Sequence, residues 1–207
     1  MKPHEEQILR ALANDVRVLS LPQVARTWWT NTRWGQSRAK AAMAALEGSG
    51  WLQIHRSLAR PVTELQKPLM SWATGEDEPD FWHLSRVLHK RAMQDASMTS
   101  FVFASPRTIV LFGQGRAPSV KLTQMTHDLH VSEVYLRYRT DGLSSRHWIS
   151  EDRLPREWPL RERPDAVLSD DEGRVHRAVE YGGNYPPKRL AELHAALSSI
   201  ELAYEIW

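Results

Sequence analysis

Apolar residues recur at helical spacing three times near the start of the chain. Residues 4–15 and 20–29 each place a row of apolar side chains on one face, and the second segment starts at Ser20, a favourable N-cap. Residues 36–47 are the most regular of the three. Their i, i+3, i+4, i+7 positions predict a buried row made of Ala39, Ala42, Met43 and Leu46.

Two short strands are predicted directly after the third helix. Residues 51–57 and 62–67 are strand-like, and the turn-prone residues 58–61 separate them. Three helices followed by such a hairpin predict a winged helix-turn-helix domain over residues 1–75. A small helical bundle with an ordinary polar surface is the alternative that the same pattern allows.

The face of the third helix opposite its apolar row carries small and basic side chains. Small side chains let a helix backbone approach a duplex, while neighbouring cations reach phosphates. Further positive charge follows on the predicted hairpin. The sequence therefore predicts double-stranded DNA as a partner, with these contact residues: Arg33, Ser37, Arg38, Lys40, Arg56 and Arg60.

The rest of the chain predicts a connecting region, residues 76–100, and a second domain, residues 101–207. The connecting region holds an acidic run, interpreted as a solvated loop, and a helix. The second domain is expected to contain a hairpin at 100–105 and 108–113, a helix at 121–130, strands at 131–139, 163–170 and 175–183, a helix at 186–200 and a strand at 201–207. The predicted class is α+β with two domains, the second a small α/β domain with a mixed sheet.

Composition and charge narrow the class of protein. The 207 residues include no cysteine, which excludes disulfides and thiolate metal sites. The net charge is +2, but residues 1–75 carry ten Lys/Arg against five Asp/Glu and residues 121–207 carry twelve against fifteen. No stretch approaches the roughly 20 apolar residues of a membrane span. We therefore expect a cytoplasmic protein with no membrane partner, and its nine tryptophans mostly in cores or between domains.

Two acidic residues on neighbouring predicted strands are the main chemical signal of the second half. Asp165 stands in RPDAVL and Glu180 in HRAVEYGG, and two such carboxylates can hold Mg²⁺ over a phosphodiester. Asp128 or Glu133 would assist them. A lysine that orients the attacking water is missing two positions after Glu180. Lys188 would replace it only by folding back from the next helix.

A structural role for the acid pair is the open alternative. Asp165 would then pair with Arg163 or Arg189, and Glu180 with Lys188, Arg189 or His127, because a buried carboxylate needs a partner. His127 and His130 make only a weak zinc motif without a second pair. The sequence contains no GxGxxG, GxxxxGK[ST] or GxSxG motif, which argues against a phosphate-binding loop or a serine hydrolase elbow.

The element order helix, strand, strand, strand, helix, strand, with acids on the second and third strands, resembles the PD-(D/E)xK nucleases. Glu180-Tyr181-Gly182 stands in place of their Glu-x-Lys. Together with the winged helix, this half resembles the replication-relaxation family of mobile-element proteins. The residues that carry the resemblance are His127-Asp128-Leu129, Arg163-Pro164-Asp165, Glu180 and Arg189-Leu190.

Three functions are consistent with these signals. The resemblance implies a DNA-binding protein in the replication, transfer or transcription control of a plasmid, phage or integrated element, with a nuclease-like domain that lacks catalysis and needs no cofactor. Its partner besides DNA would be a second copy or another mobile-element protein. The second function is an active endonuclease, in which Asp165, Glu180 and Lys188 are catalytic and Asp165, Glu180 and Asp128 bind Mg²⁺. The third is an immunity or antitoxin-like interaction module.

Overall fold

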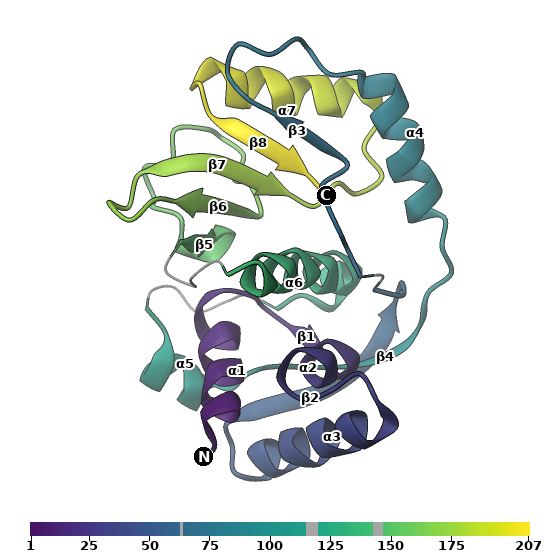
Figure 1. The fold of residues 1–207 in the computed structure, drawn as a ribbon, viewed down its shortest axis with the longest axis vertical. Coiled ribbons are helices and arrows are strands. Elements are labelled where there is room, and N and C mark those ends of the chain that lie inside the picture. Colours follow the sequence, from purple (N-terminus) through teal and green to yellow (C-terminus); the bar gives the residue numbers. More distant parts are fainter. Residues whose placement is uncertain (63, 115–119, 143–146) are drawn as a thin grey trace. The chain divides into compact units, whose positions relative to one another are not determined.

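The computed structural model describes residues 1–62, 64–114, 120–142 and 147–207 (Figure 1). These residues form a mixed α+β fold with seven α-helices and two β-sheets. The chain divides into two compact units. The three-stranded unit is Met1–Val62 with Ala96–Leu136, and the five-stranded unit is Thr63–Asp95 with Arg137–Trp207. This division differs from the linear one into residues 1–75, 76–100 and 101–207, because each unit combines segments that are distant in the chain.

The three-stranded unit begins with the three predicted helices, which are confirmed as α1 (Pro3–Asn14), α2 (Leu21–Trp28) and α3 (Arg33–Gly48). Its antiparallel sheet has the order β1-β4-β2. The strands are β1 (Leu19–Ser20), β2 (Leu52–Ala59) and β4 (Ser97–Ala104). Helix α5 (Pro106–Phe112) and helix α6 (Met125–Thr140), as far as Leu136, complete the unit.

The second predicted strand of the hairpin, residues 62–67, is wrong. Residues 62 and 64–67 are not in a strand, and residue 63 lies outside the described residues. The partner of β2 is β4, in a register from Leu52 opposite Ala104 to Ala59 opposite Ser97. The reason is burial: β4 supplies the fully buried Phe101 and Val102, whereas residues 62–67 are largely polar.

Two further predicted strands are helices. Residues 108–113 fall in α5, where the hydroxyl of Ser105 accepts a hydrogen bond from Thr108 N (3.3 Å) and Pro106 occupies the first turn. The strand expected at 131–139 is the continuation of α6. Five consecutive residues, from Ser132 to Leu136, are buried in this helix. A helix buried on several sides has no clear polar face, so the sequence does not show the helical period there.

The five-stranded unit has the strand order β3-β8-β7-β6-β5. Only β7 and β8 are parallel; the other neighbours pair in antiparallel fashion. The strands are β3 (Met70–Trp72), β5 (Trp148–Ser150), β6 (Ala166–Ser169), β7 (Val175–Glu180) and β8 (Ala203–Ile206), and the helices are α4 (Phe81–Ala92) and α7 (Pro187–Ser199). This confirms the strands predicted from residue 163 onward and the helix between them.

The core of the five-stranded unit joins α4 and α7 to the sheet. Leu84 and Leu88 of α4 and Leu190 of α7 are buried together with Tyr204 and Ile206 of β8. In chain order, α6 is followed by β5, β6, β7, α7 and β8. The predicted order of elements is therefore present, but its first strand lies at Trp148–Ser150 and not at residues 131–139.

Candidate functional site

Helix α3 is fixed in the three-stranded unit by one buried row of side chains. Its N-cap is Thr32, whose hydroxyl accepts a hydrogen bond from Gly35 N (3.1 Å). The buried residues are Gly35, Ala39, Met43 and Leu46, so three of the four predicted core positions are confirmed. Ala42, the fourth, is half-buried. The remaining faces of the helix are open to solvent.

Gly35 allows the turn between α2 and α3 to pack closely. A Cβ atom at this position would lie 2.2 Å from the carbonyl oxygen of Thr30, a distance that no side chain tolerates without backbone movement. The sequence signal was a glycine inside a helix, which costs stability unless it serves packing. Gly35 therefore sets the position of the first turn of α3.

The outer face of α3 carries most of the predicted DNA contacts. Arg33, Ser37, Arg38 and Lys40 are all exposed. Trp34 lies among them with 62% of its surface exposed, and the guanidinium of Arg38 is 5.1 Å from the centre of its ring. Trp34 is thus an exception to the expectation that the tryptophans lie mostly in cores or between domains. Sequence reasoning missed this residue because it assigned no tryptophan to the exposed face of the helix.

The ribbon formed by β2 and β4 adds to this surface. Alternate residues of a strand point to opposite faces, and Ala59 and Phe101 on one face pack with Met125 and Leu129 of α6. The opposite face bears Arg56, which is exposed and faces Ser100 across the ribbon. Figure 1 shows α3 and α6 on opposite sides of this sheet.

Two apolar side chains and a second arginine lie near the end of the ribbon. Leu58 pairs with Met98 across the strands, and 62% and 54% of their surfaces are exposed. Arg60 is half-buried just beyond β2, and its backbone N–H donates to the hydroxyl of Thr126 (3.1 Å). Arg60 is thus less accessible than the other predicted contacts. We call the remaining exposed set the basic face: Arg33, Trp34, Ser37, Arg38, Lys40 and Arg56.

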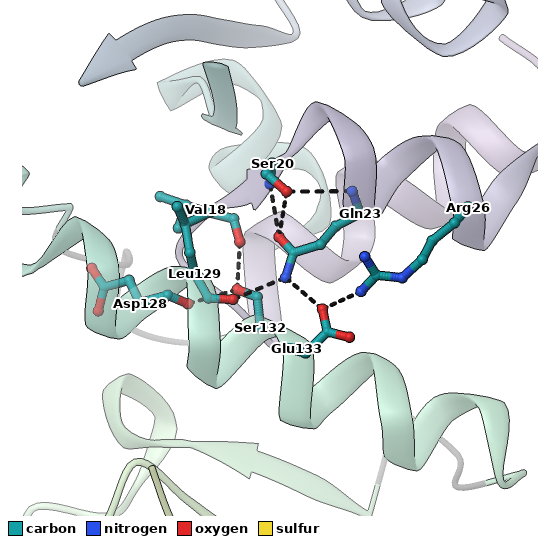
Figure 2. A network of polar contacts seen from close by, with 8 residues as sticks. All are labelled: Val18, Ser20, Gln23, Arg26, Asp128, Leu129, Ser132 and Glu133. Atoms are coloured by element: carbon teal, nitrogen blue, oxygen red, sulfur yellow. Dashed lines mark hydrogen bonds and ion pairs between the residues drawn. The ribbon is translucent and has the colours of Figure 1, made fainter. Parts of the chain in front are cut away.

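A buried polar network holds α2 against α6 in the three-stranded unit (Figure 2). The side-chain nitrogen of Gln23 donates to Leu129 O and to Glu133 Oε2, both at 2.9 Å, and Arg26 also donates to Glu133. The hydroxyl of Ser132 donates to Val18 O (2.5 Å). Gln23, Glu133 and Ser132 are thus each hydrogen-bonded within the fold, which is the usual state of buried polar side chains.

Two candidate metal ligands belong to the three-stranded unit and have protein partners there. Glu133 accepts from Gln23 and Arg26 in the network just described. Asp128 is buried, and its Oδ1 lies 3.3 Å from Arg17 Nη1. The described residues contain no group of three or more His, Cys, Asp or Glu side chains arranged to hold a metal ion. Asp128 and the acid pair belong to different units of the chain.

The structure does bring Asp165 and Glu180 together in the five-stranded unit. Ala166 faces Val179 in the pairing of β6 with β7, so Asp165 and Glu180 meet at the end of this register. The backbone N–H of Asp165 donates to Glu180 Oε2 (3.3 Å). The N–H of Tyr181 donates to Asp165 Oδ2 (2.7 Å).

Tyr185 is the partner of Glu180 that the sequence did not reveal. Its phenolic hydroxyl donates to Glu180 Oε1 at 2.7 Å, and Glu180 is only 8% exposed. Burial, together with the nearby charge of Glu180, raises the pKa of Tyr185 well above its ordinary value. The phenol therefore keeps its proton and remains a donor. Both carboxylates of the pair thus accept hydrogen bonds from the chain itself.

Gly182, where the resemblance predicts a lysine, is closely surrounded by the core. A Cβ atom on Gly182 would lie 2.7 Å from Leu88 Cδ2 of α4 and 2.9 Å from Ile206 Cγ2 of β8. A larger residue here would require these two buried side chains to shift. Lys188 does not replace the missing lysine in this structure, since its side chain is 89% exposed and lies 3.9 Å from Glu192 on the same helix.

A cavity of about 300 Å³ opens beside Glu180. Arg163 and Arg189 line it, along with apolar side chains of α7. Arg189 forms an ion pair with Glu162, and this hydrogen bond raises the pKa of Arg189. Arg163 donates to the carbonyls of Leu154 (3.1 Å) and Pro155 (2.8 Å). The arginines next to the acid pair are therefore bound to protein groups.

Comparisons with protein-family models, with curated proteins and with solved structures found no match. Across the described ranges, no helix is both long enough and apolar enough to cross a lipid bilayer.

Proposed function

We propose that this protein binds double-stranded DNA through the basic face of its three-stranded unit. The observation that carries the proposal is the outer face of α3, where exposed cations surround small side chains and a solvent-exposed indole. In DNA-binding helices, small residues allow close approach to the groove and cations contact the phosphates.

The arrangement of elements supports a winged helix-turn-helix. Three helices, the order α1-β1-α2-α3-β2-β4 and the strand order β1-β4-β2 fit such a domain. The β2–β4 ribbon takes the place of the wing, and α3 that of the helix that enters the major groove. The connection between β2 and β4 differs from a short wing turn, because it carries β3 and α4 of the five-stranded unit.

The charge of the three-stranded unit supports the same proposal. Its two segments contain twelve Lys/Arg against six Asp/Glu, a net +6, whereas the five-stranded unit contains fifteen against nineteen, a net −4. The two sums give the +2 of the whole chain. A unit with this charge attracts polyanions, and the attraction falls as salt rises.

In this proposal the five-stranded unit is a degenerate nuclease-like domain of the PD-(D/E)xK kind. Its acid pair is engaged by Tyr185 and by backbone N–H groups, and the space for the lysine is taken by Leu88. The unit would serve in partner contact or dimerisation. By the resemblance to replication-relaxation proteins, we place the protein in the replication, transfer or transcription control of a mobile element; this step is an analogy of fold.

A Mg²⁺-dependent endonuclease is the second candidate, because Asp165 and Glu180 do converge at adjacent strand ends. Arg163 and Arg189 line the neighbouring cavity and would face a phosphodiester there. In such an enzyme the two carboxylates would hold the metal, which lowers the pKa of the attacking water.

One set of measurements separates these functions. Fluorescence anisotropy with a labelled duplex, titrated at several salt concentrations, is expected to show affinity that falls linearly on a log–log plot. Incubation with supercoiled DNA and Mg²⁺ or Mn²⁺ is expected to leave the DNA intact. Cleavage that disappears in both Asp165→Ala and Glu180→Ala would establish the endonuclease instead. Absence of any salt-dependent affinity would refute DNA binding and favour a protein-interaction module.

A further inference from the structure

The Trp34–Arg38 pair is more than a source of charge on the basic face. The two residues are one helical turn apart and therefore lie on the same side of α3. The guanidinium carbon of Arg38 is 5.1 Å from the centre of the indole ring, and the ring itself is largely exposed. Both side chains are therefore accessible to a ligand that approaches this face.

Contact with the indole restricts the side chain of Arg38. An unrestricted arginine side chain loses rotamer entropy when it binds a ligand. An arginine that is already held against an aromatic ring has lost part of this entropy before binding, so its binding costs less. An arginine stacked on a ring still presents its N–H groups at the edge of the guanidinium plane. That edge matches the O6 and N7 acceptors of guanine in the major groove.

We propose that Arg38, positioned by Trp34, reads a guanine base in the major groove, while the other cations of the basic face contact phosphates. The inference rests on the proposed DNA binding. Arg38 would be the residue that touches the base, and Trp34 a positioning residue that acts through it. The partner is accordingly a duplex that contains at least one guanine at a fixed place in the site.

The test begins with selection of binding sites from a pool of randomised duplexes, using the full chain. Affinity for the selected site and for an unrelated duplex is then measured for the wild type and for Arg38→Lys, Trp34→Ala and Trp34→Tyr. Arg38→Lys keeps the charge but removes the two-pronged donor edge. Trp34→Tyr keeps an aromatic ring beneath the guanidinium. Lys40→Ala is the matched control for an exposed cation on the same helix.

We expect Arg38→Lys to weaken binding of the selected site about tenfold and to leave the unrelated duplex within about twofold. Trp34→Ala should weaken the selected site about threefold to fivefold without changing the salt dependence, and Trp34→Tyr should restore most of the loss. In an Arg38→Ala background, Trp34→Ala should have no further effect. Lys40→Ala should weaken both duplexes equally and reduce the salt slope by about 1.

Three results would overturn the inference while DNA binding stands. In the first, the selected sites share no guanine at a fixed position, and in the second, Arg38→Lys lowers the affinity for both duplexes equally. The third such result is a loss of affinity by Trp34→Ala that persists in the Arg38→Ala background. Absence of binding to every duplex would instead overturn the proposed function itself. Because both side chains are exposed, thermal unfolding of the variants should match that of the wild type.

Discussion

The basic face of the three-stranded unit and the acid pair of the five-stranded unit differ in how their charges are used. Arg33, Arg38 and Lys40 extend from a helix into solvent. Asp165 and Glu180 lie at adjacent strand ends, where a tyrosine hydroxyl and backbone N–H groups already occupy their oxygen atoms. Charges that are exposed on a rigid element are available to a ligand. Carboxylates that already accept hydrogen bonds from the fold must lose some of these bonds before they bind a ligand.

Gly182, two positions after Glu180, shows a further difference between the two regions. Leu88 of α4 and Ile206 of β8 occupy the space that a side chain at this position would need. This position therefore belongs to the core of the five-stranded unit, whereas the basic face is open to solvent.

Removal of the exposed cations of the basic face should have the largest effect. Replacing four of them by alanine is expected to weaken duplex binding about a hundredfold to a thousandfold near 0.1 M salt, and to make the log–log salt slope shallower by about 3 to 4. Anisotropy titrations measure both quantities. The replaced residues are Arg33, Arg38, Lys40 and Arg56.

The control for this variant removes the same charge from exposed sites of the five-stranded unit, namely Lys67, Arg86, Lys90 and Arg156. It should change affinity by less than about tenfold, because only long-range attraction is lost. Equal losses in the two variants would mean that net charge, and not the basic face, binds the DNA.

Loss of one carboxylate from the buried network between α2 and α6 should lower the free energy of unfolding. Glu133→Ala removes the carboxylate that accepts from Arg26 and, besides Leu129 O, from Gln23, and it is expected to lower the free energy of unfolding by about 2 to 4 kcal/mol. Urea denaturation measures this change. Glu6→Ala, which breaks an exposed ion pair with Arg10 (2.8 Å), should cost less than about 0.5 kcal/mol. A Glu133→Ala variant as stable as Glu6→Ala would contradict the role of the network.

Filling the space at Gly182 should destabilise the five-stranded unit. Gly182→Ala places a methyl group against Leu88 and Ile206 and is expected to cost about 1 to 3 kcal/mol. Gly183→Ala is the matched control, since its Cβ atom would meet only the ring of Tyr185 at 3.3 Å. Chemical denaturation compares the two. Equal stability of both variants would show that the lysine position is not closed by packing.

Loss of the tyrosine hydroxyl should have the smallest effect. Tyr185→Phe keeps the ring but removes the donor to Glu180, which is expected to cost about 1 kcal/mol of unfolding free energy. Duplex affinity should stay within about twofold of the wild type, because the basic face is unchanged. If this variant bound DNA much more weakly than the wild type, the five-stranded unit would take a direct part in binding.

Local patterns predicted the helices and the acid pair. Residues near α1, α2, α3 and α7 repeat their apolar positions with the helical period, and caps or prolines mark the starts of these helices. Asp165 and Glu180 come together because a short turn joins their strands, and the register of a hairpin follows from its turn. The basic residues of α3 lie opposite its apolar row for the same periodic reason.

Long-range pairing was not predictable in this way. The partner of β2 is a strand about forty residues later in the chain. A local pattern identifies two strand-like segments, 62–67 and 100–105, but does not say which of them pairs with β2. Helix α6 has buried polar residues, such as Ser132 and Glu133, whose partners lie on α2 and at Val18. Its sequence therefore resembled an alternating strand.

The sequence by itself determined that the segments of α1, α2, α3 and α7 are helical, which face of α3 is basic, and that two acids stand on neighbouring strands, because each of these follows from spacing within a few residues. Only the tertiary structure decided that β4 completes the first sheet, that the indole of Trp34 stays exposed, and that Leu88 packs against Gly182. The reason is that side-chain packing and strand pairing depend on surfaces that come from distant parts of the chain.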